Sequence, residues 1–214
     1  MSPTGAQRPA GSPVRFVLAT FNRDKLRELS ALLGLPGITL TALCDVPGAI
    51  PPAETGATLR ENALLKARAA LALTGLPAFG DDTGLEVDAL GGRPGIHAAR
   101  YAGPRASYAE NLAKLLAELR GVEAARRTAR FRCACVACLP GGRELVAEGV
   151  LEGRIALAPR GANGFGYDPA FEIEGLGRTL AELSEAEKNT LSHRARAVHA
   201  LAALLVEAVP GLAG

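Results

Sequence analysis

The sequence predicts an α/β fold in which helices flank a mixed β-sheet. Two observations lead to this prediction: strands and helices alternate in the first half of the chain, and two long apolar runs in the middle are joined by a tight turn. Hydrophobic residues make up 48% of the 214 residues and charged residues 21%. Such a chain can bury a sizeable core, so we expect one domain or two tight lobes and exclude general disorder.

The expected strands are apolar runs bounded by turn residues. They cover residues 14–19, 38–42, 77–80, 131–139 and 144–156. The last two are joined through Pro140-Gly141-Gly142, which indicates an antiparallel pair. This hairpin follows short strands that alternate with helices, and the combination is what makes the expected sheet mixed.

The expected helices show apolar residues at helical spacing or begin at a Ser/Thr-x-x-Glu sequence. They cover residues 23–33, 58–74, 107–119, a short stretch after 184, and about 193–209. Gly34 and Pro36 end the first helix. In a Ser/Thr-x-x-Glu capping box, the two side chains satisfy backbone N–H groups that the first turn leaves free, so these sequences mark helix starts.

Charge and hydropathy exclude two classes of protein. The net charge of +2 is too balanced for a protein that binds nucleic acid mainly by bulk charge. No apolar run reaches the roughly 18 residues that a membrane helix needs. Residues 1–13 are rich in Pro, Gly, Ala and Ser and lack the apolar core of a secretion signal. We therefore expect a disordered tail before a single domain over 14–214, in a cytoplasmic protein that binds neither nucleic acid nor membrane.

The segment Thr20-Phe21-Asn22-Arg23-Asp24-Lys25 joins the first strand to the first helix. Backbone N–H groups and the helix dipole favour an anion at such a junction. Thr20 and Asn22 add hydrogen-bonding side chains, and Lys25 adds a mobile charge suited to phosphate. The loop alone favours a structural alternative, in which Asn22 caps the helix and Lys25 lies at the surface.

Two adjacent carboxylates, Asp81 and Asp82, stand at an expected strand end between glycines. Neighbouring carboxylates are unfavourable unless a positive charge compensates them. Mg²⁺ is the natural candidate, because it takes carboxylate oxygens together with waters and substrate phosphates, and Glu54 could be a further ligand. One carboxylate could instead act as general base on an attacking water. A solvated acidic turn is an equally supported alternative.

The segment Phe165-Gly166-Tyr167-Asp168 places aromatic rings beside glycines, and Lys188, His193 and Arg194 follow as hydrogen-bond donors near a helix start. Flat aromatic surfaces and edge-on donors suit a nucleobase. The alternative is core packing of the two rings, with a helix-start hydrogen bond for His193, since a single histidine is usually structural.

Together these segments resemble the inosine triphosphate pyrophosphatase family, in order from about Val14 to Leu205. The resemblance rests on Thr20-x-Asn22-x-x-Lys25, Glu54-Thr55-Gly56, the run from Asp81 to Gly95, residues 164–169, and Glu187-Lys188-Asn189-x-x-Ser192-His193-Arg194. It implies an elongated mixed sheet with helices and two lobes around an active-site cleft, in a homodimer. It also implies Mg²⁺-dependent hydrolysis of ITP, dITP or XTP to the monophosphate and pyrophosphate, which keeps these nucleotides out of DNA and RNA.

The resemblance also implies a role for each matching residue. Residues 20–25 hold the triphosphate, Asp82 is the catalytic base, and Glu54 with Asp82 binds the metal. Thr83 stands where many members carry Ser, and it keeps the hydroxyl. The positions that bind the base are Phe165, Gly166, Tyr167, Asp168, Lys188, His193 and Arg194. A permanently charged arginine is a donor suited to the acceptor oxygen of a 6-oxo purine.

Two alternatives use the same residues. The first is a related pyrophosphatase of dTTP and UTP, which the long run from Asp81 to Gly95 and the Ser192-His193-Arg194 sequence oppose. The second is a nucleotide-binding sensor without catalysis, which the retained Asp82, Glu54 and Lys25 oppose. Turnover of inosine and pyrimidine nucleotides separates all three.

Overall fold

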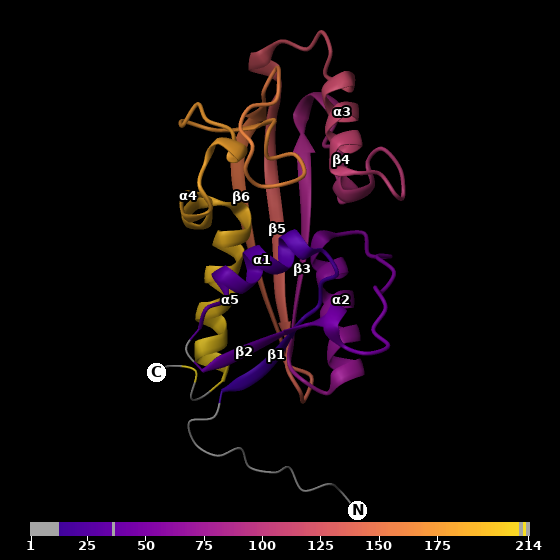
Figure 1. Cartoon of the computed structure of the whole chain (residues 1–214), viewed down its shortest axis with the longest axis vertical. Helices are drawn as coiled ribbons and strands as arrows, with labels where there is room; N and C mark the ends of the chain where they lie inside the picture. Colours follow the sequence, from indigo (N-terminus) through magenta and orange to yellow (C-terminus); the bar gives the residue numbers. More distant parts are fainter. Residues whose placement is uncertain (1–12, 36, 210–211, 213–214) are drawn as a thin grey trace, which may run out of the picture.

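The structure is a computed structural model that describes residues 13–35, 37–209 and 212. A seven-stranded mixed sheet runs along the long axis of the molecule, with helices on both faces (Figure 1). The strand order is β2 (Ile38–Ala42), β1 (Val14–Leu18), β3 (Ala78–Val87), β5 (Thr128–Cys138), β6 (Glu144–Ile155) and β7 (Phe171–Ile173), and β4 (Pro94–Gly95) pairs with β3 outside this order. Strand β1 is parallel to β2 and β3, and the remaining pairs are antiparallel. The predicted α/β class with a mixed sheet is confirmed.

The helices begin at residues that cap them. They are α1 (Arg23–Leu32), α2 (Leu59–Thr74), α3 (Tyr108–Glu118), α4 (Glu185–Leu191) and α5 (His193–Ala208). The capping boxes predicted at Ser107 and Ser184 are complete. At α2 the capping box is incomplete. Thr58 accepts from the backbone N–H of Glu61, but the Glu61 carboxylate accepts from the backbone N–H of Ala57 and not from that of Thr58. Within the described residues, no helix has the length and apolarity that crossing a bilayer requires.

Two glycines let helices lie against the sheet at close range. Helix α2 covers β3 and β5 on one face, and α5 covers β5 and β6 on the other (Figure 1). A Cβ atom on Gly80 would lie 2.3 Å from the carbonyl oxygen of Ala63 in α2, and one on Gly149 would lie 2.1 Å from that of His193 in α5. Only glycine permits these approaches, which bring side chains of α2 and α5 to the middle of the sheet.

Two hydrophobic clusters fill opposite ends of the long strands. One gathers β1, α1 and α5 around Phe16 and Phe79, whose rings stack at 4.4 Å. The other packs α3 and the segment 167–183 around Phe131 and Phe171, at 4.7 Å. Because β3 and β5 contribute to both clusters, the two ends share one sheet, and the polar residues described below lie between them.

Strand β3 is longer than the sequence pattern predicts. We expected it to end near Gly80, yet it pairs with β5 without interruption from Ala78 to Val87. The expectation that Asp81 and Asp82 stand at a strand end is therefore wrong, because both lie in the middle of a strand. Because both residues are charged, a hydrophobicity pattern does not identify this part of the strand. In the folded protein, cations from distant segments compensate the charges of the two carboxylates. The tail predicted over 1–13 falls almost wholly outside the described residues and stays a prediction.

Candidate active site

The site forms where strand β1 ends and β3 continues. Strand β1 pairs with β3 only as far as Leu18 and Phe79, and β4 pairs with the same edge from Leu85 onward. No described strand covers this edge between Gly80 and Gly84. The loop after β1 and the start of α1 lie against the gap, as expected of ligand sites at the carboxyl ends of parallel strands.

Asp81 and Asp82 point to opposite faces of the sheet, because side chains alternate along a strand. On the α5 face, the Asp81 carboxylate lies 3.0 Å from Lys25 Nζ and 3.5 Å from Arg194 Nε. On the α2 face, the Asp82 carboxylate lies 2.8 Å from Lys66 Nζ. Each carboxylate thus has its own nearest cation, Lys25 for Asp81 and Lys66 for Asp82.

The electrostatics keep both sides of β3 charged. Burial alone would raise the pKa of the Asp81 carboxyl, but the Lys25, Arg194 and Lys66 cations outweigh it and hold that pKa well below its usual range. Burial alone would lower the pKa of the Lys66 ammonium, yet the surrounding carboxylates raise it above its usual value. Asp81 is therefore anionic and Lys66 cationic at neutral pH.

Lys66 is the centre of a group that sequence reasoning missed. Its ammonium lies 2.7 Å from Glu54 Oε1 and 2.8 Å from Asp82 Oδ1, and it donates to the backbone oxygen of Asp81 at 3.2 Å. Glu54 also pairs with Arg100 at 2.7 Å. One signal pointed to Lys66: only four of the 24 basic residues are lysines.

Glu54 and Asp82 fit a magnesium ion in one specific way. Both contact the same Lys66 nitrogen, so their carboxylates converge. Among residues 13–35, 37–209 and 212, no group of three or more His, Cys, Asp or Glu converges as a metal cage would. Two carboxylates suit Mg²⁺ when substrate phosphates and waters complete the shell, which is its usual arrangement at nucleotide sites.

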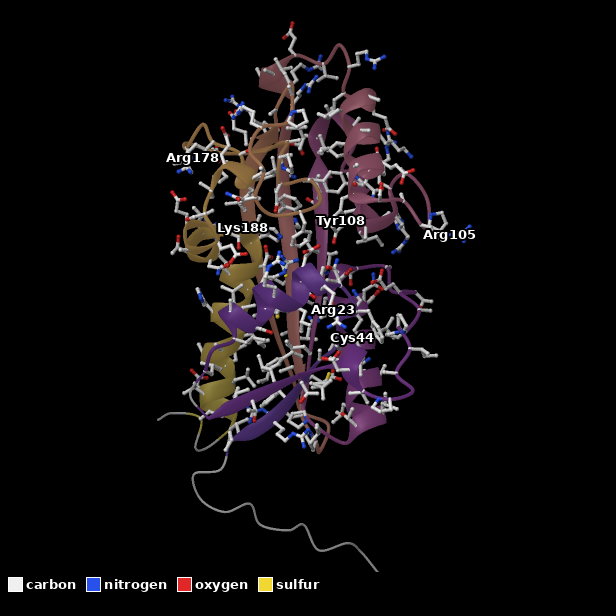
Figure 2. All side chains as sticks on the ribbon, in the orientation of Figure 1. Arg23, Cys44, Arg105, Tyr108, Arg178 and Lys188 are labelled. Atoms are coloured by element: carbon white, nitrogen blue, oxygen red, sulfur yellow. The ribbon has the colours of Figure 1, made fainter. Side chains whose placement is uncertain are left out.

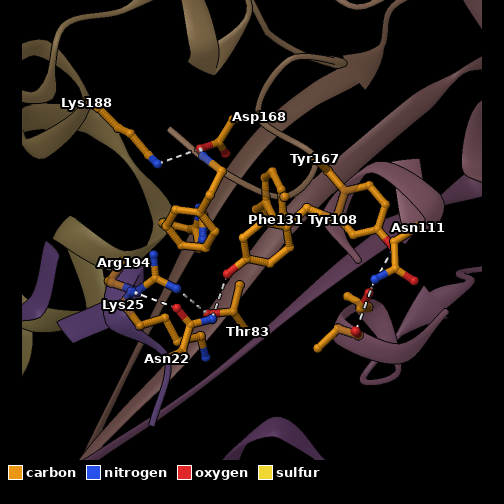
Figure 3. Close-up of a pocket in the computed structure, with 15 residues that line it drawn as sticks. Asn22, Lys25, Thr83, Tyr108, Asn111, Phe131, Tyr167, Asp168, Lys188 and Arg194 are labelled. Carbon is orange, nitrogen blue, oxygen red and sulfur yellow. Dashed lines mark hydrogen bonds and ion pairs between the residues drawn. The ribbon is translucent and has the colours of Figure 1, made fainter. Parts of the chain in front are cut away.

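Two cavities meet at this site. The charged cavity, as we call it, is lined by Thr20, Phe21, Asn22, Lys25, Glu54, Lys66, Asp81, Asp82 and Thr83 among others. The aromatic cavity is lined by Asn22, Lys25, Thr83, Tyr108, Phe131, Phe165, Gly166, Tyr167, Asp168, Lys188, His193 and Arg194 among others (Figure 3). Asn22, Lys25 and Thr83 belong to both, so the cavities adjoin. The joint cavity therefore has charged side chains at one end and aromatic rings at the other.

The loop from Thr20 to Lys25 is only partly directed at the cavities. Asn22 caps α1, accepting from two backbone N–H groups, and its amide also donates to the Tyr108 hydroxyl at 2.9 Å. The structural alternative for Asn22, that it caps the helix, is thus correct. Its side chain also lines both cavities. The Arg23 and Asp24 side chains pair with Asp45 and Arg27 instead and line neither cavity, so their assignment to the substrate stays a prediction.

Asp168 fixes the loop that carries Phe165. Its carboxylate accepts from the backbone N–H of Phe165 at 2.9 Å and from Lys188 Nζ at 2.7 Å. The Lys188 ammonium in turn lies 5.0 Å from the Phe165 ring centroid. Tyr167 is buried, and its hydroxyl donates to the Ala98 oxygen, so it forms a fixed wall of the cavity.

Tyr108 lines the aromatic cavity and links the start of α3 to the start of α1. It begins α3, its hydroxyl contacts Asn22 and Asp24 at the start of α1, and its ring lies 5.5 Å from that of Phe165. It lies at the same level along the long axis as Lys188 (Figure 2). No sequence signal marked Tyr108, because its partners are more than 50 residues away.

His193 and Arg194 start α5 inside the aromatic cavity. The imidazole of His193 stacks on Phe131 at 4.6 Å, and its buried Nδ1 has no hydrogen-bond partner among the residues that the structure describes. Burial, with the Arg194 and Lys188 cations, lowers its pKa well below the ordinary value, so the ring is neutral at pH 7. Arg194 donates to the Thr83 hydroxyl at 3.0 Å.

Glu28 is the second residue that sequence reasoning missed. Its carboxylate pairs with both Lys188 and Arg194, which follow it by 160 and 166 residues. Burial would raise its pKa, but these two cations lower it below the usual range. Glu28 holds both cations at the cavity, and no local pattern could have revealed partners so far away.

Comparisons with known proteins agree with this arrangement. The Ham1 family model matches residues 16–204. A dITP/XTP pyrophosphatase of Geobacillus kaustophilus is 52% identical over 183 residues, which cover 86% of this chain and 90% of the relative. The Ham1 protein of Staphylococcus aureus superimposes with a TM-score of 0.81 at 36% identity, over 91% of this chain and all of that one. A HAM1 protein of Coxiella burnetii gives 0.80 at 42% identity, over 91% and 99%. The predicted resemblance is confirmed, and the chain belongs to the Ham1 family.

Proposed function

We propose that this protein hydrolyses non-standard purine nucleoside triphosphates, such as dITP and XTP, to the monophosphate and pyrophosphate. The observation that carries the proposal is the junction of a charged cavity and an aromatic cavity at Asn22, Lys25 and Thr83. A nucleoside triphosphate has the same division into a charged chain and a flat ring. The Geobacillus kaustophilus relative, with 52% identity, is a dITP/XTP pyrophosphatase.

The charged cavity takes the triphosphate and its metal. Thr20, Asn22 and Lys25 lie where the loop after β1 meets the start of α1, and they supply a hydroxyl, an amide and an ammonium. Glu54 and Asp82 are the residues that hold Mg²⁺. When bound, the ion neutralises charge on the polyphosphate and polarises its phosphorus–oxygen bonds.

Asp82 is the group that activates water in this proposal. Its carboxylate accepts a proton from the water as the water oxygen attacks the α-phosphorus. The bond from that phosphorus to the bridging oxygen breaks, and pyrophosphate leaves with the electron pair. Lys25 stabilises the charge that accumulates on the phosphate oxygens. Asp81 does not share this role, because it faces Lys25 and Arg194 on the other side of β3.

The aromatic cavity takes the base. Phe165 offers a ring surface, and Arg194 and His193 face the same cavity from the start of α5. Arginine can only donate hydrogen bonds, so it suits the 6-oxo group of hypoxanthine or xanthine. Adenine presents an amino group at that position and leaves the donor unpaired, at a cost of about 1–3 kcal/mol.

The test is a substrate panel of ITP, XTP, GTP, ATP and dTTP with Mg²⁺, with pyrophosphate and orthophosphate assayed separately. We expect rapid pyrophosphate release from ITP or XTP and little release from the others. Because GTP shares the 6-oxo group, its low release must depend on its 2-amino group and not on Arg194. Preference for dTTP would support a pyrimidine pyrophosphatase, and ITP binding without turnover would support a sensor. Either result would contradict the proposal.

The homodimer that the family resemblance implies and the cytoplasmic location that the sequence predicts are also part of the proposal. Light scattering coupled to size-exclusion chromatography tests the homodimer, with a mass near twice 22.0 kDa as the expected result. A monomer at micromolar concentration would contradict it.

A further inference from the structure

The Lys66 ammonium lies between the two carboxylates that the proposed function assigns to the metal. It forms an ion pair with Glu54 at 2.7 Å, and it donates hydrogen bonds to the Asp82 carboxylate at 2.8 Å and to the Asp81 backbone oxygen at 3.2 Å. A lysine ammonium can donate three hydrogen bonds, and three oxygen atoms lie around it here. Its side chain is only 13% exposed. The carboxylate pair is therefore already neutralised and hydrogen-bonded by the protein itself.

We propose that Lys66 is a displaceable internal counter-ion, which holds Glu54 and Asp82 in the nucleotide-free protein and keeps them from binding free divalent ions. The ion then enters together with its nucleotide, and Lys66 moves onto a phosphate oxygen. This inference rests on the proposed function in one respect, the assignment of Glu54 and Asp82 as metal ligands.

Competition follows from the geometry. An ammonium and a divalent ion within contact distance of the same two carboxylates repel each other, so both cannot hold the pair as Lys66 now does. We expect Lys66 to leave the two carboxylates only when an equally good acceptor is present, because its departure would otherwise break three contacts. Phosphate oxygens in the charged cavity are such acceptors, and Lys66 is one of the residues that line that cavity. Its flexible four-carbon stem allows the movement.

The arrangement on the other face of β3 supplies a matched control. Lys25 is also a lysine that contacts a buried aspartate, at 3.0 Å from Asp81, and it lines the same cavity. It does not contact Glu54 or Asp82 in the structure. Removing its charge tests the general electrostatic effect, whereas removing that of Lys66 also vacates the carboxylate pair.

The test measures Mn²⁺ binding to the nucleotide-free protein by electron paramagnetic resonance. Lys66→Gln removes the charge and keeps a hydrogen-bond donor, and Lys66→Arg keeps the charge. We expect weak Mn²⁺ binding in the wild type and in Lys66→Arg. In Lys66→Gln we expect the Mn²⁺ affinity to be higher by about tenfold or more, because groups around a metal alter its affinity on this scale. Lys25→Gln should change the affinity much less. Equal affinity in wild type and Lys66→Gln, or an equal gain in Lys25→Gln, would overturn the proposal.

A second titration tests the movement of Lys66, with tripolyphosphate as the probe. With the protein and Mn²⁺ present, we expect Lys66→Gln to bind tripolyphosphate more weakly than the wild type, because the ammonium that should move to the phosphate is gone. Equal binding would contradict the movement. Circular dichroism confirms that each variant is folded. Neither titration involves turnover or a base, so a failure of the proposed substrate class would leave both results interpretable.

Discussion

Asp81 and Asp82 are neighbours in the sequence and have separate environments in the structure. The alternation of side chains along β3 places one among Lys25 and Arg194 and the other beside Lys66. Asp81 thereby connects the loop after β1 to the start of α5, while Asp82 lies with Glu54 at the Lys66 ammonium. In the proposed mechanism, a single strand position thus separates the residues that bind the substrate from those that react.

This separation predicts that Asp82→Asn removes turnover and leaves binding. We expect kcat to fall by about 10²–10⁴, the usual contribution of a general base, with nucleotide affinity little changed. Asp88→Asn is the control, because Asp88 directly follows the same strand and contacts Thr128 and Arg130 at the surface. Near-normal turnover in Asp82→Asn would contradict its role as base.

Arg194 determines the choice of base in this account, and it is also a structural residue. It contacts Asp81, Glu28 and Thr83. Arg194→Ala should therefore cost about 1.5–3 kcal/mol of unfolding free energy, the range for lost hydrogen bonds to charged groups, because Asp81 and Glu28 keep only Lys25 and Lys188 as cations. It should also reduce the preference of kcat/KM for ITP over ATP. Arg196→Ala, which removes a more exposed arginine two positions away, should do neither. Unchanged discrimination in Arg194→Ala would show that other residues recognise the base.

At the scale of elements, the close contact between α5 and β6 places the base-facing residues. A methyl group on Gly149 would lie 2.1 Å from the backbone oxygen of His193 and 2.6 Å from the nitrogen of Ala197. Neither is the end of a flexible side chain, so the start of α5 must move away from the sheet. The position of His193 and Arg194 thus depends on a glycine that lines neither the charged nor the aromatic cavity.

Gly149→Ala should therefore lower both stability and substrate affinity. We expect a loss of about 1–3 kcal/mol of unfolding free energy, the range for overpacking, and a higher KM for ITP. Gly34→Ala is the matched control, since a methyl group there meets no atom of the described residues closer than 3.7 Å. Thermal melting and steady-state kinetics measure the two effects. Wild-type values of both in Gly149→Ala would mean that α5 is not held as described.

The elements also show what the sequence could predict. The starts of the long helices were predicted to within one residue, and the hairpin of β5 and β6 was predicted as well, because local spacing and capping residues encode them. Strand β5 begins three residues before its expected start. The extension of β3 was not, since its stability depends on Lys25 and Lys66 from other elements. Strands β4 and β7, with two and three residues, are too short to give a pattern.

Some residues of the site could be predicted from the sequence, and others could not. Asp82 and Arg194 belong to segments whose residue types carry the chemistry, so the sequence reveals them. Lys66 and Glu28 matter because of what they contact, and those contacts arise only when distant elements come together. Their roles could be seen only after the chain was folded.

At the scale of the whole molecule, the buried neutral His193 makes stability depend on pH. Burial and the adjacent cations lower its pKa well below 6.5. As the pH falls through 6.5, the unfolded chain takes up a proton that the folded protein does not, so the unfolded state is favoured. The free energy of unfolding should therefore decrease between pH 7.5 and 5.5, by at most about 1.4 kcal/mol per pH unit. Urea unfolding of wild type and His193→Asn measures it, and an equal slope in both would contradict the assignment.

The central claim concerns the whole active site: water attacks the α-phosphorus of a 6-oxo purine triphosphate bound across both cavities. Hydrolysis of ITP in ¹⁸O-labelled water with Mg²⁺ tests it most directly, with mass spectrometry of both products. The account predicts one ¹⁸O atom in the monophosphate and none in the pyrophosphate released with it. Label in the pyrophosphate, or release of orthophosphate, would contradict it.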